Sequence, residues 1–128
     1  MSETRPAAHE EELADDEILW RRVNPTLVKR DESGVQPMSG VFLDSQDAMS
    51  LIRAAETDPQ AALAAYPGWG MVELTAGQLR SIASLEVIAD PLENDKSHAL
   101  AKGKVSKREA KRLRAAATWV VEPDQVDE

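Results

Sequence analysis

The chain has 128 residues, of which 42% are hydrophobic and 30% charged, and its formal net charge at pH 7 is −8. These values are typical of one globular domain. The absence of cysteine excludes disulfides, thiolate metal sites and a cysteine nucleophile. No apolar run approaches the ~20 residues of a membrane span, and the first residues do not resemble a signal peptide, so we expect a soluble cytoplasmic protein without a membrane partner.

Charge is divided unevenly along the chain. Seven of the fifteen Lys and Arg residues lie between Lys102 and Arg114, whereas the segments before residue 18 and after residue 114 are rich in acids. Segments with few apolar side chains and many like charges tend to be disordered. We therefore expect a disordered acidic arm at 1–16, a single domain at 17–122 and an acidic tail at 123–128.

Four short strands are predicted in the first half of the chain, because β-prone runs alternate there with turn-forming residues. They cover residues 18–23, 26–29, 40–43 and 49–52. The fourth is ambiguous, because Ser45 is also placed to cap a helix that runs to Ala55.

Helix-capping residues mark the second half. Asp58 before Pro59 is typical of a helix start, and that helix is predicted to end near Tyr66. Thr75 is predicted to cap a second short helix at 76–82. Strands are expected at 71–74, 85–88 and 98–101.

The last predicted helix begins with a capping box, in which the side chains of Ser106 and Glu109 each bond to the other residue's backbone N–H. With about 100° between successive residues, Leu113, Ala117 and Val120 lie on one side of this helix. The opposite side, here called the basic face, carries Lys107, Arg108, Lys111, Arg112 and Arg114. The pattern predicts a long amphipathic C-terminal helix.

Short strands with two or three helices, without strict alternation, predict an α+β fold. We expect one compact domain around a small mixed or antiparallel sheet, with the basic face turned to solvent. Such a face predicts an interaction or regulatory module that binds an acidic protein or a nucleic-acid backbone. Two alternatives remain open: the face only solvates its helix, or the acidic tails neutralise it.

Several short stretches follow one another in a distinctive order: 19–22 before Pro25, 37–42, 49–51, 67–70, 74–77, and Asp90-Pro91 with His98-Ala99 and Gly103-Lys104. In this order they resemble a family of small bacterial proteins without an established activity, over residues 18–122. In that family the stretch before the Phe usually reads Pro-Ser-Ser-Ala-Ala-Phe, whereas here it reads Pro-Met-Ser-Gly-Val-Phe, so one serine is missing. The resemblance implies a shared fold and no mechanism.

A second resemblance concerns residues on separate elements. An Arg on the first strand, a Ser on a middle strand and a later carboxylate, here Arg22, Ser50 and Glu73, are loosely similar to the arrangement in mono-ADP-ribosyltransferases. The resemblance implies that Arg22 would hold phosphates and that Glu73 would stabilise an oxocarbenium-like centre. With His98 as a candidate base, a small nucleotide-using enzyme or its degenerate relative is the alternative function. Each of these residues also has an ordinary structural role open to it.

The sequence contains no phosphate-binding loop, dinucleotide fingerprint, nucleophile elbow or zinc-protease motif, so no cofactor is expected. The only other histidine, His9, lies in the acidic arm, which argues against a two-histidine metal site. The positions of Arg22, Ser50 and His98 in the folded chain can decide between the enzyme and the interaction module. One shared pocket would favour the enzyme, and scattered positions would favour the interaction module.

Overall fold

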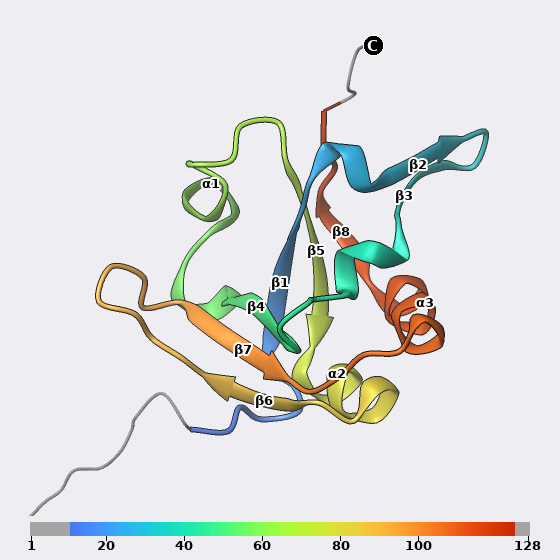
Figure 1. Cartoon of the computed structure of the whole chain (residues 1–128). Helices are drawn as coiled ribbons and strands as arrows, with labels where there is room; N and C mark the ends of the chain where they lie inside the picture. Colours follow the sequence, from blue (N-terminus) through green and yellow to red (C-terminus); the bar gives the residue numbers. More distant parts are fainter. Residues whose placement is uncertain (1–10, 125–128) are drawn as a thin grey trace, which may run out of the picture.

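A computed structural model of the chain describes residues 11–124. Within them, six strands form one sheet in the order β6-β7-β4-β1-β5-β8, and every neighbouring pair is antiparallel (Figure 1). Two further strands form a separate hairpin. The bounds are β1 Ile18–Val23, β2 Val28–Asp31, β3 Gly34–Pro37, β4 Ala48–Arg53, β5 Gly70–Thr75, β6 Glu86–Ala89, β7 His98–Lys102 and β8 Thr118–Val121. The predicted α+β class is confirmed, and of the two sheet types left open, mixed or antiparallel, the protein has the antiparallel one.

The three α-helices of the described residues begin at the predicted caps. They are α1 Pro59–Ala62, α2 Ala76–Ala83 and α3 Lys107–Ala116. Asp58 Oδ1 accepts from Ala61 N at 2.8 Å, and the α2 and α3 caps are both complete capping boxes. Each cap satisfies backbone N–H groups that the first turn of a helix leaves free. Local sequence therefore decides where these helices start.

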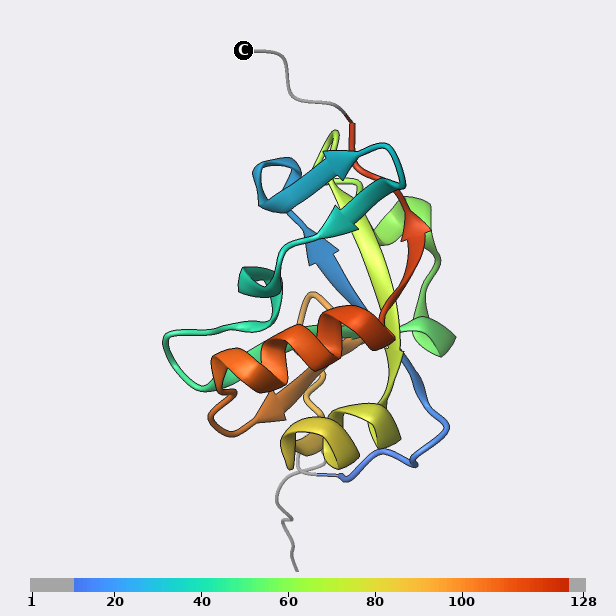
Figure 2. The same ribbon diagram turned by 90° about the vertical axis from the view of Figure 1, so that its right-hand side faces the viewer.

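Hydrophobic residues pack on both faces of the sheet. The helices α2 and α3 lie side by side against one face (Figure 2), where Phe42, Leu79 and Leu113 are fully buried. A smaller cluster on the other face joins α1 to the sheet and consists of Trp20, Ile52, Ala62 and Met71. Successive side chains of a strand point to opposite faces, so β1 contributes Leu19 to the first cluster and Trp20 to the second.

The C-terminal helix is shorter than predicted. It has ten residues and ends at Ala116, so placing Ala117 and Val120 on it is wrong. Residues 118–121 instead form β8, which pairs with the open edge of β5. Trp119 Nε1 also donates a hydrogen bond to Val35 O at 2.8 Å. A Thr-Trp-Val-Val run has high β propensity, and an available strand edge favours the sheet over another helical turn.

Two predictions in the first half also need correction. The expected strand at 40–43 is a short 3-10 helix, Ser39–Phe42, which places Val41 and Phe42 in the core. Residues 25–27 form another 3-10 turn, so β2 begins only at Val28. Its partner β3 was not predicted, because Gly-Val-Gln-Pro lacks a β-prone pattern; pairing across the hairpin makes it a strand.

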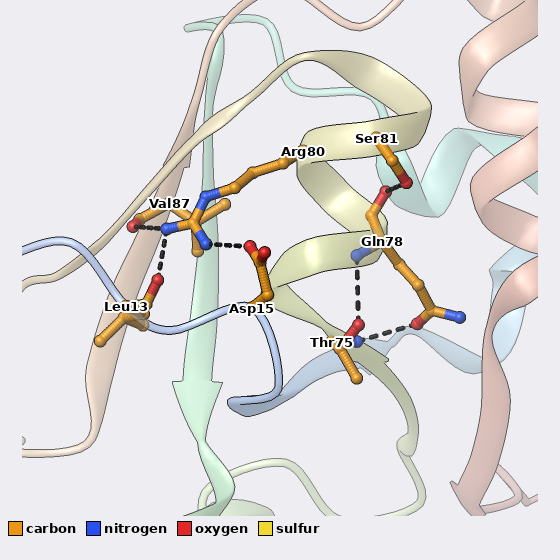
Figure 3. A network of polar contacts seen from close by, with 7 residues as sticks. All are labelled: Leu13, Asp15, Thr75, Gln78, Arg80, Ser81 and Val87. Carbon is orange, nitrogen blue, oxygen red and sulfur yellow. Dashed lines mark hydrogen bonds and ion pairs between the residues drawn. The ribbon is translucent and has the colours of Figure 1, made fainter.

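Part of the predicted acidic arm belongs to the domain. Residues 1–10 lie outside the described residues, but Leu13 is buried and its N–H donates to Val87 O at 3.1 Å. Figure 3 shows how Arg80 holds this segment: its guanidinium contacts Leu13 O, Val87 O and the Asp15 carboxylate, the last at 2.7 Å. The expected disorder is therefore wrong for residues 11–16, because they cover the edge of β6.

The opposite end of the described chain is packed as well. Pro123 is buried, its carbonyl accepts from Arg30 Nη2 at 3.0 Å, and Asp124 N donates to Gly68 O at 2.9 Å. Pro123 and Asp124 therefore pack with the domain, two residues beyond the predicted boundary at 122. The remainder of the predicted tail, residues 125–128, lies outside the described residues. Among residues 11–124, no helix combines the length and apolarity needed to cross a membrane.

Candidate functional site

The sheet opens between its two central strands. Strand β1 pairs with β5 along six residues, but it pairs with β4 only at Leu19↔Arg53 and Trp20↔Ile52. Beyond Trp20 the two strands separate, and a cleft of about 400 Å³ lies at this opening. We call it the β1–β4 cleft. Its lining includes Arg21 and Arg22 of β1, Ser50, Leu51 and Ile52 of β4, Tyr66 and Trp69 from the segment before β5, and His98 of β7.

Arg21 fills part of the opening. Its Nε donates to Val41 O at 3.0 Å and its Nη1 donates to Ser50 O at 2.9 Å. These bonds satisfy carbonyl groups that no neighbouring strand reaches. Burial lowers the pKa of Arg21, with Asp44 acting in the opposite direction and Arg22 in the same one. An arginine stays charged in spite of such a shift. Arg21 is therefore a fixed cation whose hydrogen bonds bridge the gap between the two separated strands.

Arg22 points to the opposite face from Arg21 and is held differently. Its Nε donates to Ala62 O at 2.8 Å, and its guanidinium carbon lies 4.3 Å from the centre of the Tyr66 ring. Tyr66 in turn contacts Trp69, with 5.0 Å between the ring centres. Among residues 11–124, neither Nη atom of Arg22 makes a hydrogen bond. The described part of the protein therefore orients this cation through Nε and the Tyr66 ring alone.

Ser50 and His98 meet on the same face as Arg22. Ile52 pairs with both Trp20 and His98, so the next positions on that face are Arg22 on β1 and Ser50 on β4. His98 Nε2 lies 3.3 Å from Ser50 Oγ. The register of three antiparallel strands therefore brings three of the sequence-predicted site residues into one cleft.

Asp90 completes a polar chain that sequence reasoning missed. Its Oδ2 lies 3.0 Å from His98 Nδ1, its carbonyl oxygen lies 3.1 Å from the same atom, and its N–H donates to His98 O at 2.9 Å. The side chains of His98 and Asp90 are only 17% and 18% exposed. A partial signal was available: Asp90 follows the predicted strand at 85–88 and His98 begins the one at 98–101, so antiparallel pairing of the two strands would bring these residues to the same end of the pair.

Glu73 does not belong to this group. It lies opposite Trp20 on β5, and its Oε1 accepts from Trp20 Nε1 at 3.3 Å. Trp20 therefore stands between Glu73 and the β1–β4 cleft, which Glu73 does not line. The structure brings Arg22, Ser50 and His98 together and separates them from the fourth candidate.

The basic face is on the far side of α3 from the core. Ala110 and Leu113 are buried, whereas four of the five predicted cations are exposed: Lys107, Arg108, Lys111 and Arg112. Arg114 is half-buried and lines shallow grooves beside Gln36 and Pro37 of β3. No carboxylate of residues 11–124 lies within ion-pair distance of these five side chains.

In the described part of the chain, no three His, Asp or Glu side chains group as metal ligands do.

Comparison with known proteins adds no candidate function. No family model matches the sequence, and comparisons with curated proteins and with solved structures gave no match. The two resemblances drawn from the sequence stay hypotheses, and function is inferred from the geometry of the chain itself.

Proposed function

We propose that the protein binds a small anionic molecule of the nucleotide class in the β1–β4 cleft. The observation that carries this proposal is the convergence of Arg22, Ser50 and His98 on one cleft from three different strands. A guanidinium, a hydroxyl and an imidazole that line one cleft can all offer hydrogen bonds to the same bound molecule. Their convergence favours the nucleotide-using alternative over the interaction module.

The chemistry of the cleft suits such a ligand. A guanidinium can bind a phosphate or a carboxylate through two parallel hydrogen bonds, and the Nη atoms of Arg22 make no hydrogen bond within residues 11–124. Arg22 is already held by Ala62 O and by the Tyr66 ring, so little conformational freedom is lost on binding. Tyr66 and Trp69 offer aromatic surface to a planar base. The cleft volume of about 400 Å³ lies in the usual range for small-molecule sites.

Ligand-induced stabilisation tests the proposal. Nucleoside mono- and diphosphates should raise the melting temperature of the protein. At a concentration 100 times its Kd, a ligand adds about 2.7 kcal/mol to the free energy of unfolding. The matching nucleoside and inorganic phosphate should each do less, because each lacks one half of the recognised chemistry.

Arginine variants show whether the binding is local to the cleft. Arg22→Ala should remove the stabilisation, whereas Arg112→Ala, a cation lost from the exposed basic face, should keep it. A wild-type protein that no nucleotide or other phosphate ester stabilises at millimolar concentration would contradict the proposal.

The basic face supports a second candidate function, binding to an acidic protein or to a nucleic-acid backbone. Its specific support is that four exposed cations lie on one helix of an otherwise acidic chain, without a described carboxylate partner. The acidic pI of about 4.8 favours a protein partner over nucleic acid.

Charge reversal separates this function from nonspecific attraction. Lys111→Glu with Arg112→Glu should abolish binding to polyglutamate and to a DNA duplex at low salt. Lys29→Glu with Lys96→Glu changes the net charge equally at two other exposed positions and is the matched control. Equal binding by the two double variants would reduce the basic face to a solvated surface.

A further inference from the structure

Binding of an anion gives no reason for the hydrogen-bonded chain from Ser50 through His98 to Asp90. We propose that Ser50 is a nucleophile and that the β1–β4 cleft hydrolyses esters of small anionic acids. The substrate class rests on the proposed function, because Arg22 would select the anionic group. The nucleophile itself rests on separate contacts, those of His98 with its two neighbours.

The contacts of His98 select the tautomer that a general base needs. Nδ1 faces two acceptors, the carboxylate and the carbonyl oxygen of Asp90. An acceptor cannot bond to a nitrogen lone pair, so in the neutral ring Nδ1 carries the hydrogen and Nε2 carries the lone pair. That lone pair lies 3.3 Å from Ser50 Oγ. The hydroxyl of Ser50 therefore donates to His98, which is the direction in which the proton must move for Ser50 to attack.

The support around Ser50 is rigid, and its hydroxyl is accessible. Met49 and Leu51 on either side are each 2% exposed and anchor β4 in the core. The Ser50 carbonyl is held by Arg21 Nη1 at 2.9 Å. Ser50 itself is exposed and lines the cleft, whereas His98 and Asp90 are mostly covered. A reactive group on a packed strand with a covered, oriented base is the arrangement that nucleophilic catalysis requires.

The reaction proceeds in two balanced steps. Ser50 Oγ forms a bond to the ester carbonyl carbon, whose C=O π pair moves onto the carbonyl oxygen, while the Ser50 proton passes to His98 Nε2. The C=O bond then re-forms as the ester C–O bond breaks, and the leaving alkoxide takes the proton from His98, which leaves an acyl-Ser50. In the second step water adds to the acyl carbon in the same way and gives a proton to His98. The C–Oγ bond then breaks, the acid is released, and Ser50 Oγ takes the proton back. The Asp90 carboxylate, 3.0 Å from His98 Nδ1, stabilises the transient imidazolium.

Covalent labelling tests the nucleophile directly. A fluorophosphonate probe should add one equivalent to the wild-type protein, detected by intact mass and mapped to Ser50. Ser50→Ala should not be labelled. Ser45→Ala removes an exposed serine that makes no hydrogen bond to a histidine of residues 11–124, and it should be labelled normally. His98→Gln and Asp90→Asn should slow labelling, the first by about 100-fold or more. A circular dichroism melt shows that each variant is folded.

Ester hydrolysis distinguishes the nucleophile from the anion site. The wild-type protein should hydrolyse mono-4-nitrophenyl succinate faster than 4-nitrophenyl acetate, and Arg22→Ala should lower the rate with the succinate much more than the rate with the acetate. If the two esters are hydrolysed at equal rates and the probe labels Ser50, the role of Ser50 as nucleophile is upheld and the preference for an anionic substrate is overturned. A protein that nucleotides stabilise but that is neither labelled nor active on either ester would overturn the nucleophile and leave the binding proposal standing.

Discussion

The β1–β4 cleft and the basic face both gather positive charge, but they hold it in different ways. In the cleft, Arg21 donates to two carbonyl oxygens, and Arg22 combines one such bond with a contact to the Tyr66 ring. On α3, four cations extend from the helix without an ion-pair partner among residues 11–124. The cleft contains fewer charges, but each of them has a defined direction.

The difference shows what charge density alone leaves out. Exposed charges on flexible side chains attract at long range, and salt screens that attraction beyond about 8–10 Å. They also lose conformational freedom when a partner fixes them. A guanidinium already held by neighbours avoids much of that cost. The basic face therefore suits diffuse attraction, and the cleft suits one defined small ligand.

Loss of the Leu113 side chain should have the largest effect on stability, because this side chain packs α3 against the core. Comparing it with a lysine of the same helix separates the contribution of packing from that of charge. Leu113 is fully buried. We expect Leu113→Ala to lower the free energy of unfolding by about 2–5 kcal/mol. Lys111→Ala, on the exposed side of the same helix, should change it by less than about 0.5 kcal/mol. Urea unfolding measures both, and similar losses would show that α3 is not held by its apolar side.

Replacing the two cleft arginines should produce the next largest loss of stability, and the loss should be larger for Arg21 than for Arg22. Arg21→Ala leaves the carbonyl oxygens of Val41 and Ser50 without this donor, and the cost of about 1–3 kcal/mol for an unsatisfied buried group applies to the more covered one, at Val41. Arg22→Ala removes one hydrogen bond and an aromatic contact worth about 0.5–1 kcal/mol, so it should destabilise less. The expected pattern is that Arg21 governs stability and Arg22 governs ligand binding. The reverse order would contradict the roles assigned to them.

Removal of the α3 cap should have a smaller effect. Ser106→Ala takes away the acceptor for Glu109 N, which lies at 3.0 Å, and should cost about 0.5–2 kcal/mol. Ser106→Asn keeps a capping oxygen and should retain most of the stability. Thermal unfolding compares the two variants, and equal melting temperatures for both would argue against the capping box. Neither change should alter ligand binding in the cleft.

Reversing charges on the basic face should have the smallest effect on stability. Lys111→Glu with Arg112→Glu should shift the free energy of unfolding by no more than about 0.5 kcal/mol per site, because both side chains are exposed. Nucleotide stabilisation of the cleft should be unchanged. If the double variant loses nucleotide binding, the two regions are coupled and the contrast between them fails.

Local sequence determined where the helices begin. The caps at Asp58, Thr75 and Ser106 act on backbone groups within three residues, so no distant contact is needed to form them. The same holds for two strands: the β-prone run at 18–23 ends before Asn24-Pro25, and the run at 71–74 lies between the turn at 67–70 and the helix cap at Thr75. Arg22, Ser50 and His98 could be singled out as candidates because their chemistry is a property of residue type.

Only the tertiary structure decided how these pieces combine. Residues 118–121 leave the helix because the edge of β5 is open to them, and Leu13 is ordered because β6 offers it a partner. Asp90 joins His98, and His98 joins Ser50, through the order β6-β7-β4. Contacts of this kind depend on which strands become neighbours, and that choice is made by burial of the whole core, which no short stretch of sequence contains.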